Sequence, residues 1–250
     1  FIASRLGGAL KLVRSFFNNN DADNDGTGDG LNVTAVQGAA TLTGISTSAT
    51  TGNQRNGVVL NKVTGKVSLE DSTANGNAEA GIDLNEVGEV ELKDQTASDN
   101  ANGVLVDDFT SFSDSGGTYE RNANGGVSLT TGTGVVSLTD SVVSGSAGGI
   151  GVLAKDIGGA VTLSGVQVST SQQGLELDNI TGNITVREAG SAVSEVKNNS
   201  GDGVVIKNSS TATVSISNTQ VSGNEGVGVR GTDIAGFLTD HATVSENEAG

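Results

Sequence analysis

Acidic side chains stand at alternate positions in one short segment near the N-terminus, residues 21–30, which reads DADNDGTGDG. Carboxylates at positions 1, 3, 5 and 9 of such a loop can converge on one hard cation, and Gly26 at the turn permits a sharp reversal. Ca²⁺ accepts about six to eight oxygen ligands. The segment therefore predicts a calcium site built from four carboxylates and one backbone carbonyl: Asp21, Asp23, Asp25, Asp29 and Thr27. The alternative is a solvated acidic linker.

A second set of carboxylates could do acid–base chemistry. Asp108 lies five residues after Gly103, and Glu86 lies five residues after Gly81, while Asp107 precedes Asp108. If these glycines open stacked coils in register, the two carboxylates lie about 5 Å apart, which is the separation of a retaining glycosidase pair. The alternative interpretation is a column of acids on a solvated face, without catalysis.

Two aromatic side chains follow this acidic pair closely. Phe109 and Phe112 could form a small platform against a sugar ring, or they could cover a bulged loop. The platform would favour a glycan-contact role for this part of the chain.

An Asn-then-Gly signal recurs along most of the sequence. Successive glycines at the start of short alternating segments such as GIDL and GVLV are 22 to 29 residues apart between Gly57 and Gly250. Period-two alternation of β-branched and aliphatic residues predicts strands, and each unit holds about three short strands. Strands this short must stack on copies of themselves, with Asn and Gly at one corner of every coil.

These units resemble the coils of a right-handed parallel β-helix, the pectate-lyase-like superfamily, over about residues 30–250. The resemblance implies an all-β solenoid of about nine coils, with inward Val, Ile and Leu and an asparagine ladder. The family's catalytic patterns are not matched at His241, Lys207, Arg187 or Arg230. The acidic loop is similar to thrombospondin type-3-like calcium repeats, but Asn32 stands where a complete EF-hand has Glu.

The first seventeen residues differ from the repeats. Ile2, Leu6, Leu10, Val13 and Phe17 follow helical spacing, and the segment carries three basic residues and no acid. The expected organisation is therefore an amphipathic helical cap over 1–17, an acidic loop over 18–30 and a parallel β-helix over 31–250.

The composition of the chain disfavours some classes of binding partner and bears on its location. The net charge is −16, so nucleic acid and anionic lipid are disfavoured as partners, and no apolar run is long enough to span a membrane. The chain has no Cys, which is compatible with a secreted or cell-surface protein that does not depend on disulfides.

The sequence as a whole favours a non-enzymatic extracellular structural or adhesive protein, such as a surface rod, sheath or filament subunit. Its partners would be other copies joined through the coil ends, other surface proteins, or glycans. The alternative is a polysaccharide lyase or hydrolase, or a glycan-binding module, on the same fold; Glu86, Asp107 and Asp108 are its catalytic candidates.

Overall fold

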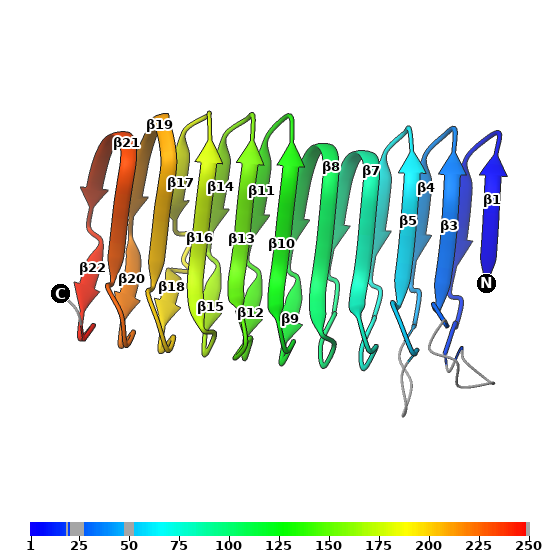
Figure 1. Ribbon diagram of the computed structural model, residues 1–250, viewed down its shortest axis with the longest axis horizontal. Helices are drawn as coiled ribbons and strands as arrows, with labels where there is room; N and C mark the ends of the chain where they lie inside the picture. The colour runs from blue at the N-terminus through cyan, green and yellow to red at the C-terminus, as the bar shows by residue number, and fades with distance from the viewer. Residues whose placement is uncertain (19, 21–27, 48–52, 249–250) are drawn as a thin grey trace.

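The chain winds into an elongated parallel β-helix in which each coil rests on the one before (Figure 1). The computed structural model describes residues 1–18, 20, 28–47 and 53–248. Its first face stacks ten parallel strands, so the described chain makes about nine turns. These strands are β1 (Ile2–Leu6), β3 (Leu31–Val36), β5 (Val58–Val63), β7 (Ala80–Lys93), β8 (Asn102–Ser115), β10 (Gly125–Gly132), β13 (Ile150–Ile157), β16 (Gln173–Ile180), β19 (Val204–Ser217) and β21 (Val229–Asp240).

Two further faces complete each coil. The long strands β7, β8, β19 and β21 bend from the first face into the second, where they align with shorter strands. The second face contains β2 (Leu10–Val13), β4 (Ala40–Thr43), β6 (Val67–Glu70), β11 (Val136–Thr139), β14 (Val161–Ser164) and β17 (Ile184–Arg187). The third face contains β9 (Thr118–Glu120), β12 (Val142–Ser144), β15 (Gln167–Ser169), β18 (Ser194–Lys197), β20 (Thr219–Ser222) and β22 (Thr243–Ser245).

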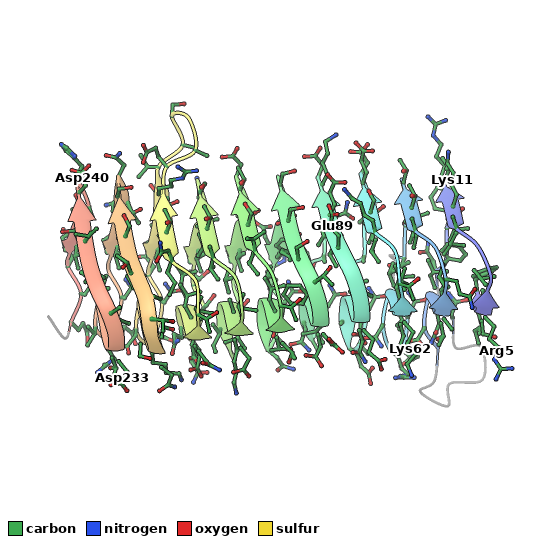
Figure 2. All side chains as sticks on the ribbon, turned by 90° about the horizontal axis from the view of Figure 1, so that it is seen from above. Arg5, Lys11, Lys62, Glu89, Asp233 and Asp240 are labelled. Atoms are coloured by element: carbon green, nitrogen blue, oxygen red, sulfur yellow. The ribbon has the colours of Figure 1, made fainter. Side chains whose placement is uncertain are left out.

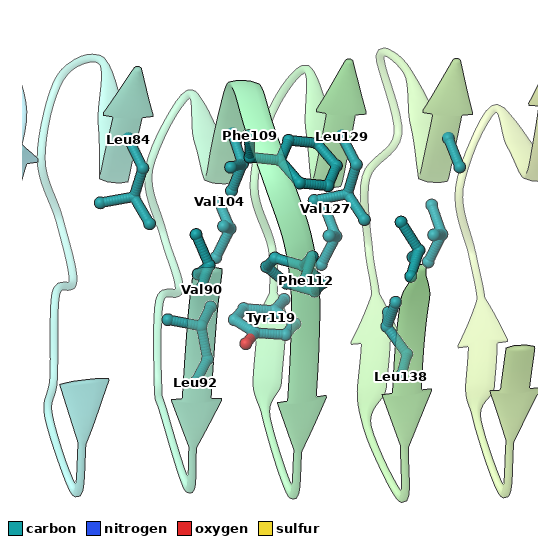
Figure 3. Close-up of a cluster of buried hydrophobic side chains, with 14 of the residues drawn as sticks. Leu84, Val90, Leu92, Val104, Phe109, Phe112, Tyr119, Val127, Leu129 and Leu138 are labelled. Carbon is teal, nitrogen blue, oxygen red and sulfur yellow. The ribbon is translucent and has the colours of Figure 1, made fainter. Parts of the chain in front are cut away.

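Aliphatic side chains fill the interior in columns, as the alternating pattern predicted. Leu84, Val106 and Leu129 occupy equivalent positions on β7, β8 and β10 and are almost completely buried. Phe109 and Phe112 belong to the same interior, where their rings meet edge to face with centroids 6.3 Å apart (Figure 3). Of the two alternatives for this pair, the sugar platform is wrong, because neither ring reaches the surface.

The recurrent Asn residues form a buried ladder at one corner of the coils. Asn53 donates to Asn77 at 2.7 Å, Asn77 donates to Asn100 at 2.9 Å, and Asn199 donates to Asn224 at 2.8 Å. The neighbouring glycines are needed for close approach: a Cβ at Gly81 would lie 2.8 Å from a backbone oxygen and 2.9 Å from the amide nitrogen of Asn100. The asparagine ladder and the all-β solenoid expected from the repeat are confirmed.

A second corner turns the chain out of the first face through residues in the left-handed region. Lys62, Glu86 and Asp108 have φ of 58°, 50° and 51° at equivalent positions in consecutive coils. Figure 2 shows Arg5, Lys62 and Asp233 of the same column along one long edge of the molecule. Short polar residues tolerate this conformation best, because their side chains can hydrogen-bond locally.

The expected helical cap over residues 1–17 is wrong. The segment instead forms the first coil, with β1 paired to β3 and β2 paired to β4. Gly7 and Gly8 disfavour a helix, and the open edges of β3 and β4 offer backbone hydrogen bonds to the segment. Leu10 and Leu12 point inward by strand alternation. The part of the chain that the structure describes contains no helix capable of crossing a membrane.

Candidate functional site

The outward surface of the first face carries polar side chains contributed by successive coils. Two columns of residues point away from the core along this face. The first column runs through Val59, Asp83, Leu105, Ser128, Leu153, Glu176, Val205 and Arg230. The second runs through Asn61, Asn85, Asp107, Thr130, Lys155, Asp178, Lys207 and Thr232.

Two hollows lie side by side over the middle coils of this face and share Leu105 and Ser128. The first, which we call the acidic hollow, is lined by Asp83, Asn85, Leu105, Val106, Asp107, Ser128 and Thr130. The second, which we call the neutral hollow, is lined by Asn102, Leu105, Asn124, Gly125, Val127, Ser128, Ile150 and Leu153. Because they share two lining residues, the two hollows adjoin each other over β7, β8, β10 and β13, and we call them together the groove.

Asp83 is the half-buried carboxylate of the acidic hollow. Its pKa lies above the ordinary value, first because burial disfavours the ionised form and then because Asp29, Glu79 and Asp107 add negative charge nearby. Arg55 acts in the opposite direction. A raised pKa in a partly buried carboxyl group is the property expected of a general acid.

Asp107 supplies the second carboxylate of the acidic hollow. Its Oδ1 accepts a hydrogen bond from the Thr130 hydroxyl at 2.6 Å, which fixes the side chain above β10. In the parallel register Asp107 lies opposite Asn85, so it is one strand and two residues away from Asp83. A strand spacing of about 4.8 Å and a rise of about 3.3 Å per residue place the two Cα atoms about 8 Å apart.

The structure separates the three residues predicted as catalytic candidates. Glu86 and Asp108 occupy equivalent positions in adjacent coils, as the spacing predicted, but both lie at the corner beside the first face. Glu86 is exposed there and pairs with Lys62 at 3.6 Å. Only Asp107 lines the acidic hollow, and its carboxylate neighbour in the hollow is Asp83.

Asp83 was missed as a candidate, although the sequence contained a signal for it. It lies two residues after Gly81 in GIDLNE, at a position that alternation places outward. Its proximity to Asp107 depends on the pairing of two coils, which one segment cannot reveal.

The predicted calcium ligands lie mostly outside the described residues. Asp21, Asp23, Asp25 and Thr27 belong to that segment, and calcium binding by the loop stays a prediction. Asp29 is described and is nearly buried. Its Oδ1 accepts hydrogen bonds from the backbone and side chain of Asn56, and its Oδ2 accepts one from Asn32. Among the described residues no cluster of three or more acidic or histidine side chains has the geometry of a metal site.

Comparisons with known proteins found similarity to a solved structure, but no match to a family model or a curated protein. One solved structure to which it is similar is the A-module of the mannuronan C-5 epimerase AlgE4 of Azotobacter vinelandii. The two share 14% identity with a TM-score of 0.27, over 96% of this chain and 91% of that one.

The expectation that the chain is not an enzyme is corrected by this finding. That expectation rested on the absence of familiar catalytic patterns at His241, Arg187 and Arg230. The structure found by the comparison is that of an enzyme module. The absence of a familiar sequence pattern is not evidence against catalysis. The chain itself is a parallel β-helix, as its strand pairing shows.

Proposed function

We propose that this protein is a carbohydrate-active β-helix that binds a polysaccharide in the groove of the first face and hydrolyses it. The observation that carries the proposal is the pair Asp83 and Asp107 in one hollow, contributed by adjacent coils. Raised pKa values in a cleft mark candidate acid–base groups, and Asp83 has this property while Asp107 accepts a hydrogen bond from Thr130.

Asp83 and Asp107 project outward from Cα atoms about 8 Å apart, a spacing compatible with an inverting reaction. Inverting glycosidases hold their carboxyl groups about 6.5–9.5 Å apart, which leaves room for a water molecule. Asp83 would give its proton to the glycosidic oxygen as the bond from that oxygen to the anomeric carbon breaks. Asp107 would take a proton from the water that attacks this carbon from the opposite face. The protons balance, and the product has the opposite anomeric configuration.

The shape of the groove supports a chain-like ligand over a single sugar. The acidic and neutral hollows share Leu105 and Ser128, so consecutive sugar units could occupy both. Outward amides, hydroxyls and aliphatic side chains offer hydrogen bonds and apolar contact, which are the interactions that sugar rings make. The alternative function is a glycan-binding module that binds the polysaccharide without hydrolysing it. The following test distinguishes this alternative from an enzyme.

The test measures both binding of a panel of polysaccharides and release of reducing ends from them, for the wild-type protein and four variants. We expect Asp83→Asn and Asp107→Asn each to lower turnover by about 10²–10⁴-fold. Asp108→Asn and Glu86→Gln are matched controls, because both residues lie at the corner outside the hollow, and they should retain turnover.

Three results would bear against the proposal. Binding without turnover would leave a glycan-binding module and contradict hydrolysis. No binding of any polysaccharide would contradict the function altogether. Turnover that survives in Asp83→Asn and Asp107→Asn but is lost in Glu86→Gln would move the site to the corner.

A further inference from the structure

We infer that the groove selects uncharged polysaccharides over polyuronates, an inference that rests on the proposed function and specifies its substrate class. The charges of the two hollows carry it. The neutral hollow is lined by eight residues, none of which is charged. The acidic hollow is lined by no basic side chain, and its carboxyl groups are those of Asp83 and Asp107.

Three basic side chains on or beside the first face already have acidic partners. Arg55 lies 3.4 Å from Glu79, and Lys207 lies 2.8 Å from Glu176. Arg230 lies 3.0 Å from Asp202. A uronate carboxylate would have to displace one of these intramolecular partners to gain a cation.

Lys155 is the exception on this face, since no ion pair within 4.0 Å is found for it among the described residues. It lies two coils beyond Asp107 in the second column, outside both hollows. Asp178 is its register neighbour on the next coil, and the carboxylate of Asp178 pairs with Lys207. At this position the positive charge of Lys155 does not compensate the negative charge of the acidic hollow.

The electrostatic field at Asp83 has the same consequence. Burial is the first cause of the raised pKa of Asp83, and the carboxylates of Asp29, Glu79 and Asp107 raise it further by disfavouring more negative charge at that point. A uronate unit bound in the acidic hollow would meet the same repulsion. A neutral unit would meet none, and its hydroxyl groups could donate to the carboxylate oxygens.

Aliphatic side chains complete the match to an uncharged chain. Leu105 and Leu153 point outward on alternate coils and are only partly buried, with Ser128 between them. This alternation presents an apolar surface every second coil and a hydroxyl between, which fits the C–H faces and hydroxyl edges of neutral sugar rings.

The experiment measures binding of matched pairs of linear oligosaccharides of equal length, with EDTA present throughout. Each pair contains a neutral member and its uronic-acid counterpart, such as mannan and mannuronan or glucan and glucuronan fragments. We expect the bound neutral member to have a Kd at least about tenfold lower, corresponding to about 1.4 kcal/mol. Its Kd should not depend on salt, whereas binding of the uronate should strengthen as salt screens the repulsion.

A designed cation tests the same inference from the opposite side. Ser128→Lys places a positive charge between the two hollows and should reduce the preference for the neutral member. Ser137→Lys is the matched control, because Ser137 lies on β11 of the second face, and it should keep the wild-type preference.

The outcomes separate this inference from the proposed function. Equal or tighter binding of the uronate member in EDTA overturns the inference and leaves the function standing. Failure of every neutral and every charged oligosaccharide to bind overturns both.

Discussion

Two carboxyl groups in adjacent coils have raised pKa values for the same first cause, yet they serve different parts of the molecule. Asp83 points outward into the acidic hollow, and Asp114 points into the core, where it is 2% exposed. Burial raises the pKa of Asp114 to about 6, against hydrogen bonds from Ser141 and Tyr119 that lower it. Burial also leads the causes at Asp83, but other carboxylates provide most of the rest.

The surroundings of Asp114 show what distinguishes the two. Its Oδ2 accepts a hydrogen bond from Ser141 at 2.7 Å, and its Oδ1 accepts one from Tyr119 at 3.0 Å. It replaces an aliphatic residue in a column that contains Leu92 and Leu138 (Figure 3). Asp83 lies in an open hollow that a ligand can enter, so a raised pKa marks a functional site only where the group is also accessible.

The largest expected effect that separates the roles of Asp83 and Asp114 is on turnover. Asp83→Asn removes the proton donor and should reduce kcat about 10²–10⁴-fold, with little change in the free energy of unfolding. In the wild-type protein, kcat should fall as pH rises through the raised pKa of Asp83, because the acid must be protonated to act. A pH–rate profile with a parallel urea denaturation measures both quantities.

Asp114→Asn is the control for that profile. It should leave the descending limb in place, because Asp114 reaches no ligand. A limb that moves in Asp114→Asn and stays fixed when Asp83 is replaced would reverse the roles of the two groups.

The second effect is on stability and belongs to Asp114. Its pKa is about 6 in the folded chain and close to the ordinary 3.8 in the unfolded chain. Between these values the unfolded chain ionises first, so the free energy of unfolding falls as pH rises from about 4 to about 6. At about 1.4 kcal/mol for each pH unit, this group's loss at neutral pH is about 3 kcal/mol.

Other groups titrate in the same range, so the measurement compares wild type with Asp114→Asn. Asp99 and Asp202 have lowered pKa values, because Arg121 and Arg230 hydrogen-bond to them, and both lose their stabilisation as pH falls. Those contributions are common to the two proteins. The difference between their unfolding free energies should change by about 3 kcal/mol from about pH 4 to about pH 7. A constant difference would contradict an elevated pKa at Asp114.

The sequence predicted the scaffold better than the site. The scaffold depends on patterns that repeat along the sequence, whereas the site depends on contacts between residues of different coils. The alternation around Gly81 and Gly103 and the spacing of Asn77 from Asn100 are local patterns repeated in every coil, and the coils confirm them. The burial of Asp114 was not predicted, although Asp114 lies two residues after Phe112 and so on the same side of the strand.

The register between adjacent coils was harder to predict than the residue pattern within a single coil. The hollow around Asp83 and Asp107 exists because Asn85 lies opposite Asp107, a register that only the stacked coils establish. The N-terminal segment shows the converse error. Leu6 and Leu10 satisfy helical spacing, but Leu10 and Leu12 also satisfy strand spacing, and the available edge of β4 decided between them.

The smallest expected effect comes from Tyr119→Phe, which keeps the ring and removes one donor from Asp114. The completely buried Tyr119 hydroxyl supports the ionised carboxylate, so its loss should raise the pKa of Asp114 further. At neutral pH the cost should be about 1.5–3 kcal/mol, the range for a hydrogen bond to a charged group. Below about pH 4 the carboxyl is neutral in both proteins, and the cost should shrink toward about 1 kcal/mol. Urea denaturation at both pH values measures the two costs. Equal costs would mean that the hydroxyl packs in the core without supporting charge, and the contrast with Asp83 would then rest on accessibility alone.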